Sequence, residues 1–240
     1  MVYPLVVIPT PVGNMEDITL RALRLLREAD MVYAEDTRTT AKLFQVHDIQ
    51  APLKSFHIHN EHSVAGELAS RVERGERVAL VSDAGTPGIS DPGFMAVRAC
   101  LERGLEVTCL PGPTAFVPAL VGSGLPCERF FFEGFLPNKK GRKTRIEALM
   151  ERDVTTVLYE SPKRLVKLLG ELQEIVGGDR QVVVARELSK KFEEFHRGSV
   201  SELQSYFEEN EPLGEIVVMV APQEKQESVH VNKYKEHNFR

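Results

Sequence analysis

The sequence predicts an α/β protein of two αβα lobes with mostly parallel or mixed sheets, and three observations support this fold class. Short apolar runs alternate with helical patterns along the whole chain, which is typical of strand–helix–strand units. The chain has 240 residues, 42% of them hydrophobic and 27% charged, enough to bury a core without disulfides. A stretch at 111–126 that is rich in proline and glycine predicts a domain boundary near 120–126.

Eight apolar runs have the length and composition of strands. They are rich in Val, Leu, Ile and Phe and alternate little, which favours strands covered on both faces. The expected strands lie at 5–8, 31–34, 78–82, 106–110, 129–132, 155–159, 181–185 and 215–220.

Helical periodicity fills the gaps between these runs, most clearly at 19–28, 60–74 and 162–176. Ser161 followed by Pro162 suits the start of the third helix, because proline fits the first helical position. That helix carries one apolar face, formed by Leu165, Leu168, Leu169 and Leu172.

The predicted organisation is an N-terminal α/β domain at 1–122, a C-terminal α/β domain at 123–221 and a polar tail at 222–240. The second domain is richer in Lys and Arg, although neither domain is net positive. The tail is polar and aperiodic, which predicts a mobile segment. One continuous sheet of eight or more strands is the alternative.

Composition excludes several classes of protein. The net charge of −5 argues against a wholly basic nucleic-acid coat but leaves room for a local basic patch. Three cysteines without paired spacing indicate neither a disulfide framework nor a structural zinc site, so we expect no metal. No apolar run has the length of a membrane span, and the first residues do not form a signal peptide. We expect a cytoplasmic protein with no membrane partner.

Three glycine- and proline-rich turns follow predicted strands directly, at 8–14, 81–93 and 110–115. Ligands of open α/β sheets bind outside the carboxyl ends of the strands, so three such turns in one domain predict a ligand site. The middle turn also carries Asp83 and Asp91, which suit an amine or ribose hydroxyls. The dinucleotide, Walker A and nucleophile-elbow motifs are missing from the sequence. The remaining candidate is a nucleoside-like or sulfonium-like ligand that is held mainly by backbone groups.

Motifs spread over about 5–220 resemble one enzyme family. They are PTPVGN at 9–14, AEDTR at 34–38, HNE at 59–61, the 81–93 turn, PGPTA at 111–115, EGFLP at 133–137, YESPKR at 159–164 and AREL at 185–188. Together they resemble the ribosomal RNA small subunit methyltransferase I family, a branch of the tetrapyrrole methylase superfamily. The first turn departs from the more usual glycine-rich form of that superfamily.

The resemblance implies a two-lobed, tetrapyrrole-methylase-like enzyme, usually a homodimer. It implies S-adenosylmethionine as cofactor, with S-adenosylhomocysteine as product, bound between the lobes. It also implies 16S RNA of the small ribosomal subunit as substrate, methylated on a cytidine 2′-hydroxyl. With the turns, it predicts a cofactor site formed by Pro11, Gly13, Asp83, Ala84, Gly85, Ile89, Ser90, Asp91, Pro111, Thr114, Ala115, Phe135, Tyr159, Glu160 and Ser161.

A ribose hydroxyl is a weak acid, so the reaction needs a base or a nearby cation. The candidates are Asp36, Glu35 and Lys163, with Glu187 behind them. The alternative for the AEDTR segment is a salt-bridged helix start with Asp36 as the cap. In the functional interpretation Arg38 lies near an RNA phosphate.

Five basic residues fall within 139–145, and a solvated helix face is the usual explanation for such a run. Here the run precedes a helix in the more basic domain, so we expect contact with RNA phosphates. The predicted RNA-binding residues are Arg38, Lys139, Lys140, Arg142, Lys143, Arg145 and Arg164.

Two further possibilities remain open. His57 and His59, with His62 and Glu61, invite a metal site, but no distant ligand with matching spacing accompanies them, so a polar wall of the cleft fits better. The function itself has two alternatives, which are methylation of a small tetrapyrrole-like metabolite and non-catalytic nucleotide binding during ribosome assembly.

Overall fold

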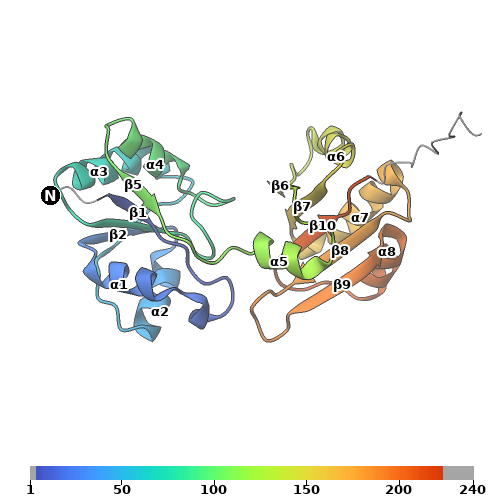
Figure 1. Cartoon of the computed structure of the whole chain (residues 1–240), viewed down its shortest axis with the longest axis horizontal. Coiled ribbons are helices and arrows are strands. Elements are labelled where there is room, and N and C mark those ends of the chain that lie inside the picture. Colours follow the sequence, from blue (N-terminus) through green and yellow to red (C-terminus); the bar gives the residue numbers. More distant parts are fainter. Residues whose placement is uncertain (1–3, 224–240) are drawn as a thin grey trace, which may run out of the picture.

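The computed structural model describes residues 4–223 and has two lobes, each built on its own five-stranded sheet (Figure 1). This confirms the two-lobed α/β prediction. The predicted tail lies outside the described residues except for 222–223. Within 4–223, no helix is long and apolar enough to cross a membrane.

The first lobe has a wholly parallel sheet of order β3-β2-β4-β1-β5. Its elements are β1 (Leu5–Val7), η1 (Met15–Asp17), α1 (Leu20–Glu28), β2 (Met31–Ala34), α2 (Thr37–Val46), β3 (Leu53–Ser55), α3 (Glu61–Glu73), β4 (Val78–Val81), α4 (Phe94–Leu101) and β5 (Val107–Cys109). Leu26 of α1 and Phe44 of α2 pack on one face of the sheet, whereas Leu68 of α3 and Cys100 of α4 pack on the other. Burial of both faces explains the unbroken apolar strand runs.

The second lobe has a mixed sheet of order β6-β7-β10-β8-β9, in which only the β6–β7 pair is parallel. Its elements are α5 (Phe116–Ser123), β6 (Phe130–Phe135), α6 (Arg142–Met150), β7 (Thr155–Glu160), α7 (Pro162–Val176), β8 (Gln181–Arg186), β9 (Glu194–Ser199), α8 (Val200–Glu209) and β10 (Ile216–Val220). Helices α6, α7 and α8 pack on one face, and α5 packs on the other.

The crossing between lobes lies earlier than the sequence predicts. Ala119 and Leu120 of α5 are buried against Val157 and Met219 of the second sheet. The connection between the lobes is therefore the loop at 110–115, and α5 belongs entirely to the second lobe (Figure 1). A boundary at 120–126 would leave most or all of this helix in the first lobe, although its apolar residues pack on the second sheet.

Two strands were not anticipated. β3 has three half-buried residues at one edge of the first sheet, and β9 is a polar edge strand with the sequence EFHRGS. Backbone pairing with β2 and β8 holds them in place. Apolar patterning is weak in such edge strands, so the sequence gives little signal.

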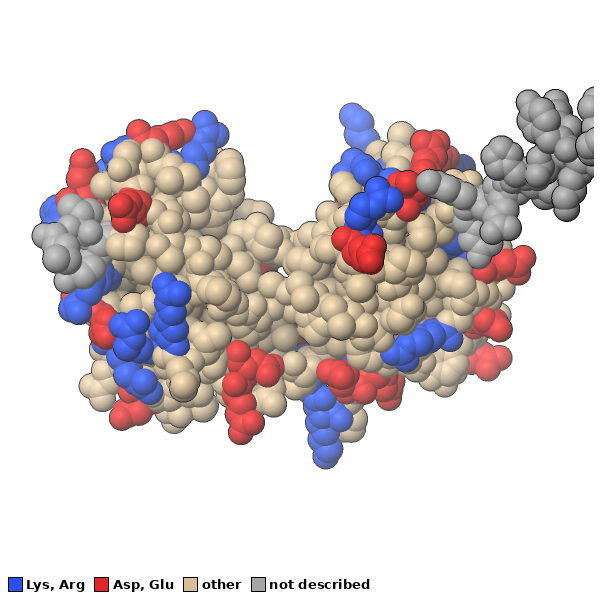
Figure 2. Space-filling model, viewed as in Figure 1, with Lys and Arg blue, Asp and Glu red and all other residues tan. Residues whose placement is uncertain are grey.

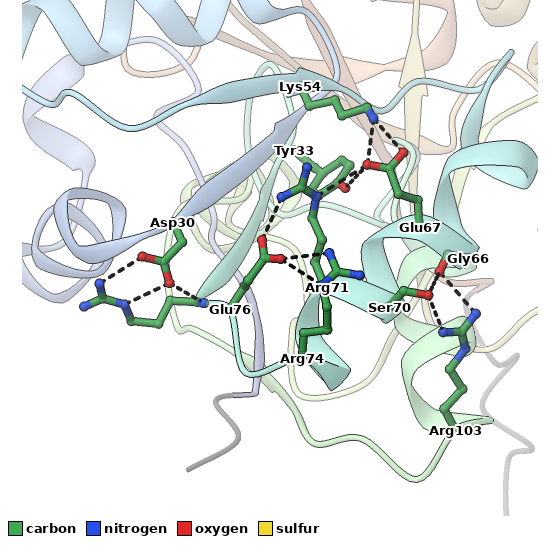
Figure 3. A network of polar contacts seen from close by, with 11 residues as sticks. Asp30, Tyr33, Lys54, Gly66, Glu67, Ser70, Arg71, Arg74, Glu76 and Arg103 are labelled. Atoms are coloured by element: carbon green, nitrogen blue, oxygen red, sulfur yellow. Dashed lines mark hydrogen bonds and ion pairs between the residues drawn. The ribbon is translucent and has the colours of Figure 1, made fainter.

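A network of ion pairs on the first lobe fastens α3 to the sheet (Figure 3). Glu67 of α3 pairs with Lys54 of β3 at 2.5 Å and accepts a hydrogen bond from the Tyr33 hydroxyl at 3.3 Å. Burial, followed by the charge of Glu67, raises the pKa of Tyr33 to about 12. Arg71 and Arg74 share Glu76 just beyond the helix. None of these side chains lines the cavity described below.

The core of the second lobe supplies a stability prediction. Leu168 of α7 is fully buried within the core cluster under α6, α7 and α8. We expect Leu168→Ala to lower the free energy of unfolding by about 2–5 kcal/mol, through lost burial and the cavity left behind. Leu20→Ala is the matched control, because Leu20 is 85% exposed and its truncation costs at most about 0.5 kcal/mol. Urea titrations of the two variants compare them, and equal losses would contradict this packing.

Candidate functional site

The three predicted ligand turns are held together at one edge of the first sheet. Strands β4, β1 and β5 are neighbours and parallel, so their carboxyl ends meet. Thr10 and Gly85 exchange two backbone hydrogen bonds of 2.9 and 2.8 Å, which join the first turn to the second. The Thr86 hydroxyl donates to the carbonyl of Pro113 at 3.0 Å, which joins the second turn to the third. The turns form one continuous wall.

A cavity of about 310 Å³ lies where this wall meets the second lobe. The first lobe and the crossing loop contribute Val12, Ala84, Gly85, Thr86, Ile89, Ser90, Asp91, Thr114 and Ala115. The second lobe contributes Phe135, Tyr159, Glu160, Ser161, Pro162, Leu188, Gly214, Glu215, Ile216 and Val217. Figure 2 shows the molecule hollowed between its two lobes, with few charged side chains on the floor of that hollow.

Most of the residues predicted for the cofactor site line this one cavity. They are Ala84, Gly85, Ile89, Ser90, Asp91, Thr114, Ala115, Phe135, Tyr159, Glu160 and Ser161. Pro11, Gly13, Asp83 and Pro111 do not line it. The structure thus brings together residues that lie far apart in the sequence.

Gly13 and Gly134 lie at close contacts between the two lobes. A Cβ on Gly13 would lie 2.5 Å from the carbonyl oxygen of Leu188, so this position of the first turn tolerates no side chain. Gly134 occupies a bulge in β6 with φ of +72°, and a Cβ there would lie 2.8 Å from Oγ of Ser90. Both glycines therefore allow contact between the lobes.

The segment that leads into β10 was not anticipated as part of the site. Gly214 and Glu215 line the cavity although they precede a strand. Because β10 runs antiparallel to β7, its first residue, Ile216, pairs with Glu160 at the end of β7. The Glu187 carboxylate accepts the backbone N–H of Glu215 at 3.0 Å and fixes this turn. Such a segment precedes its strand, so it does not lie at the carboxyl end of a strand, where ligand sites of α/β sheets are expected.

Asp91 is the titratable side chain that the cavity perturbs most clearly. Burial, followed by the charges of Glu35, Asp83 and Glu215, raises its pKa to about 7. Tyr159 contributes to the same cavity from the second lobe, and burial raises its pKa to about 12. A carboxyl that exchanges its proton near neutral pH, in a partly enclosed cavity, suits general base catalysis.

The AEDTR segment forms the start of α2, as its structural alternative predicts. Asp36 caps the helix by accepting the Arg38 N–H at 2.8 Å, and it also pairs with the Arg38 guanidinium at 2.6 Å. These contacts with Arg38 hold the pKa of Asp36 at about 2. Glu35 accepts the Asp83 N–H at 3.3 Å, and burial raises its pKa. Neither Glu35 nor Asp36 lines the cavity, and Lys163 is exposed near the start of α7, also outside the lining.

The basic run at 139–145 divides into exposed and paired residues. Lys139, Lys140 and Lys143 are exposed. Arg142 is only 3% exposed and pairs with Glu160 and Glu171, so the expectation that it faces RNA needs correction. The remaining two predicted arginines are paired as well, Arg145 with Glu133 and Arg164 with Glu160.

The histidines do not have the strand geometry assumed for them. β3 ends at Ser55, and His57 and His59 lie in the turn before α3. The His57 N–H donates to the Asn60 side chain at 2.8 Å, so Asn60 braces this turn. Among residues 4–223, no three His, Cys, Asp or Glu side chains are grouped to hold a metal ion.

Comparison with known proteins identifies the family. Residues 4–204 match the family model described as Tetrapyrrole (Corrin/Porphyrin) Methylases. The chain is 46% identical over 220 residues to the Ribosomal RNA small subunit methyltransferase I of Thermotoga maritima, covering 92% of this chain and 99% of that one. It is 48% identical over 220 residues to the protein of the same name from Pseudomonas aeruginosa, covering 90% and 78%.

Solved structures share the fold at low sequence identity. One is the uroporphyrin-III C-methyl transferase of Thermus thermophilus complexed with S-adenyl homocysteine, with a TM-score of 0.64, 20% identity and coverage of 91% and 97%. Another is a diphthine synthase, with a TM-score of 0.70, 16% identity and coverage of 90% and 89%. With two lobes, loops joined at their junction and relatives near 50% identity over almost its whole described length, the chain belongs to the tetrapyrrole methylases and, among them, to the ribosomal RNA small subunit methyltransferase I family.

Proposed function

We propose that this protein transfers the methyl group of S-adenosylmethionine to the 2′-hydroxyl of a cytidine in 16S RNA of the small ribosomal subunit. The observation that carries the proposal is the cavity between the lobes, which gathers residues from the family's motifs into one site. Relatives at 46 and 48% identity bear the name of a small subunit RNA methyltransferase. We further propose that it acts in the cytoplasm as a homodimer, on family resemblance alone.

The cavity suits S-adenosylmethionine in size and chemistry. Its volume of about 310 Å³ is in the range of small-molecule sites. Val12, Leu188 and Val217 offer apolar walls to an adenine ring, and the Gly85 region offers backbone groups at close range. The carboxyl groups of Asp91 and Glu215 complement the positive charge of the cofactor. The cofactor supplies a methyl group that is already activated on a sulfonium.

The reaction then requires a hydroxyl oxygen held in line and relieved of its proton. We assign the proton acceptor to Asp91, since it lines the cavity and has a pKa of about 7. Asp36 suits this step less well, because its pKa of about 2 makes it a weak base and Arg38 already occupies it. Glu35 and Asp83 act on Asp91 through their charge.

The proposed RNA surface borders the hollow. Figure 2 shows basic side chains on the edge of the second lobe, where Figure 1 places α6. Lys139, Lys140 and Lys143 are exposed before and at the start of this helix. Exposed lysines that lie close together in the chain are suited to bind RNA phosphates, which gives affinity without recognising particular bases.

The combined change Lys139→Ala and Lys140→Ala tests this surface. We expect RNA affinity to fall about tenfold near 0.1 M salt, and the slope of log K against log salt to shrink by about 1.5–2, because two phosphate contacts are lost. Filter binding across a salt series measures both. An unchanged slope in the variant would show that RNA binds elsewhere on the protein. If the affinity of the wild type for RNA did not depend on salt, a small-molecule acceptor would be favoured.

Methyl incorporation tests the activity itself. The purified protein is incubated with methyl-labelled S-adenosylmethionine and small ribosomal subunits from a strain that lacks the enzyme, with large subunits as the control. We expect label in the small subunit RNA only. Cofactor binding without any label in either subunit would contradict the proposed substrate.

A further inference from the structure

A buried ion network lies directly behind the cavity wall. Glu160, whose side chain is fully buried, pairs with Nη2 of Arg142 at 3.1 Å and with Nε of Arg164 at 2.7 Å. Arg142 also pairs through Nε with Glu171 at 2.7 Å. The Ser161 N–H donates to the Glu160 carboxylate at 2.8 Å, so one carboxylate joins two guanidinium groups to the start of α7.

The same two arginines hold the backbone segment that carries the exposed lysines. Nη1 of Arg142 donates to the Pro137 carbonyl at 3.3 Å. Nη1 of Arg164 donates to the side chain of Asn138. Lys139 and Lys140 follow at once and are exposed. The segment 137–140 is therefore held by two arginine side chains at two consecutive residues, Pro137 and Asn138.

Glu160 thus stands between two functional surfaces. On one side, Tyr159, Glu160 and Ser161 belong to the cavity lining. On the other, its arginines reach the segment 137–140. A buried ion pair is a poor source of net stability, because desolvation offsets the attraction of the charges, whereas it does fix geometry. A positioning role therefore explains this network better than a stabilising one.

We propose that Glu160 and Arg142 are positioning residues that set the basic segment 137–140 at a fixed place relative to the cavity, so that RNA bound by Lys139 and Lys140 is presented to it. This inference rests on the proposed function. In this arrangement Arg142 does not contact RNA itself but holds the segment 137–140 that does.

A double-mutant cycle tests the coupling. The first change is Glu160→Gln, which keeps the shape of the side chain, and Arg142 keeps Glu171 as a partner. The second is the Lys139→Ala and Lys140→Ala pair. Arg142→Lys repeats the test, because it keeps the charge but loses the planar fork. Lys167→Met is the matched control, because Lys167 pairs with the same Glu171 at 3.7 Å but is 61% exposed.

If the network positions the lysines, removing them costs about tenfold in RNA affinity in the wild type and in Lys167→Met, but only about twofold in Glu160→Gln and in Arg142→Lys. The salt slope of these two single variants already falls to that of the lysine double variant, an effect that general destabilisation does not produce. Thermal unfolding verifies that every variant is folded at the assay temperature.

Two results would overturn the inference, and they are distinguishable. Additive losses in both Glu160→Gln and Arg142→Lys, with a wild type that binds and methylates RNA, would refute the positioning role alone. A wild type that neither binds nor methylates small subunit RNA would overturn the proposed function, and this inference with it.

Discussion

Asp91→Asn is expected to lower kcat for methyl transfer by about 10²–10⁴-fold, because the amide removes the proton acceptor and keeps the size of the side chain. Binding of S-adenosylmethionine should weaken less than kcat falls, since Glu215 still complements the charge of the cofactor and the other lining residues remain. Single-turnover rates and calorimetric titration separate the two effects. A variant that keeps a wild-type rate would exclude Asp91 as the base.

The pH dependence gives an independent check on Asp91. In the free enzyme the pKa of Asp91 is about 7, so kcat/KM for the cofactor should rise about tenfold per pH unit below 7 and level off above it. Glu215→Gln should shift this profile to lower pH, since a like charge that raises the pKa of Asp91 is removed. A profile that is flat between pH 5 and pH 8 would contradict the assignment.

The same shift affects stability with a defined sign. The folded protein binds the Asp91 proton more tightly than the unfolded chain, whose ordinary pKa is 3.8. The free energy of unfolding contributed by Asp91 therefore falls as pH rises from about 4 to about 7. Asp91→Asn escapes this loss, so its Tm should exceed that of the wild type at pH 8.

Ala115→Trp is expected to reduce affinity for S-adenosylmethionine by at least about 100-fold. Ala115 lines the cavity at the start of α5, and an indole there takes up much of the volume of about 310 Å³. Calorimetric titration with the cofactor measures the loss, and thermal unfolding verifies that the variant is folded.

Val117→Trp is the matched control for this substitution. Val117 lies on the same helix, is 46% exposed and does not line the cavity, so cofactor affinity should stay within about twofold of the wild type. Equal affinities for the Ala115 variant and the wild type would place the cofactor outside this cavity.

The sequence predicts the first wall of the site well, for a physical reason. Turns rich in glycine and proline follow β1, β4 and β5, and parallel strands bring their carboxyl ends to one edge. The local composition of the turns and the general rule for ligand sites in parallel sheets were enough to predict this wall. The wall from β10 follows no such rule, because Glu215 enters through an antiparallel pairing.

The sequence around Arg142 carries two conflicting signals, a basic run and a helical period. Counted as part of a basic run, it belongs with Lys139 and Lys140. Counted as part of a helix, it shares a face with Ile146, Leu149 and Met150, all of which are buried. The helical period favours the buried position, and Glu160 and Glu171 make that position tolerable for an arginine.

The choice of Asp91 as the proposed base could not be made from the sequence. Its raised pKa depends on burial and on three carboxylates. Asp83 lies on the same turn as Asp91, but Glu35 and Glu215 come from two other segments that only the fold brings near it. Asp36 is the more conspicuous acid in the sequence, yet Arg38, two residues away, neutralises it. Electrostatic surroundings of this kind exist only in the folded chain.

Identifying the methylated nucleoside tests the proposed reaction. Small subunit RNA labelled by the wild type, and by Asp91→Asn as the matched control, is digested to nucleosides and separated with 2′-O-methylcytidine as the standard. We expect the label to elute as 2′-O-methylcytidine with the wild type and to be lost almost entirely with Asp91→Asn. Label on a base or on another ribose would rule out cytidine 2′-O-methylation, and undiminished label with Asp91→Asn would rule out Asp91 as the base.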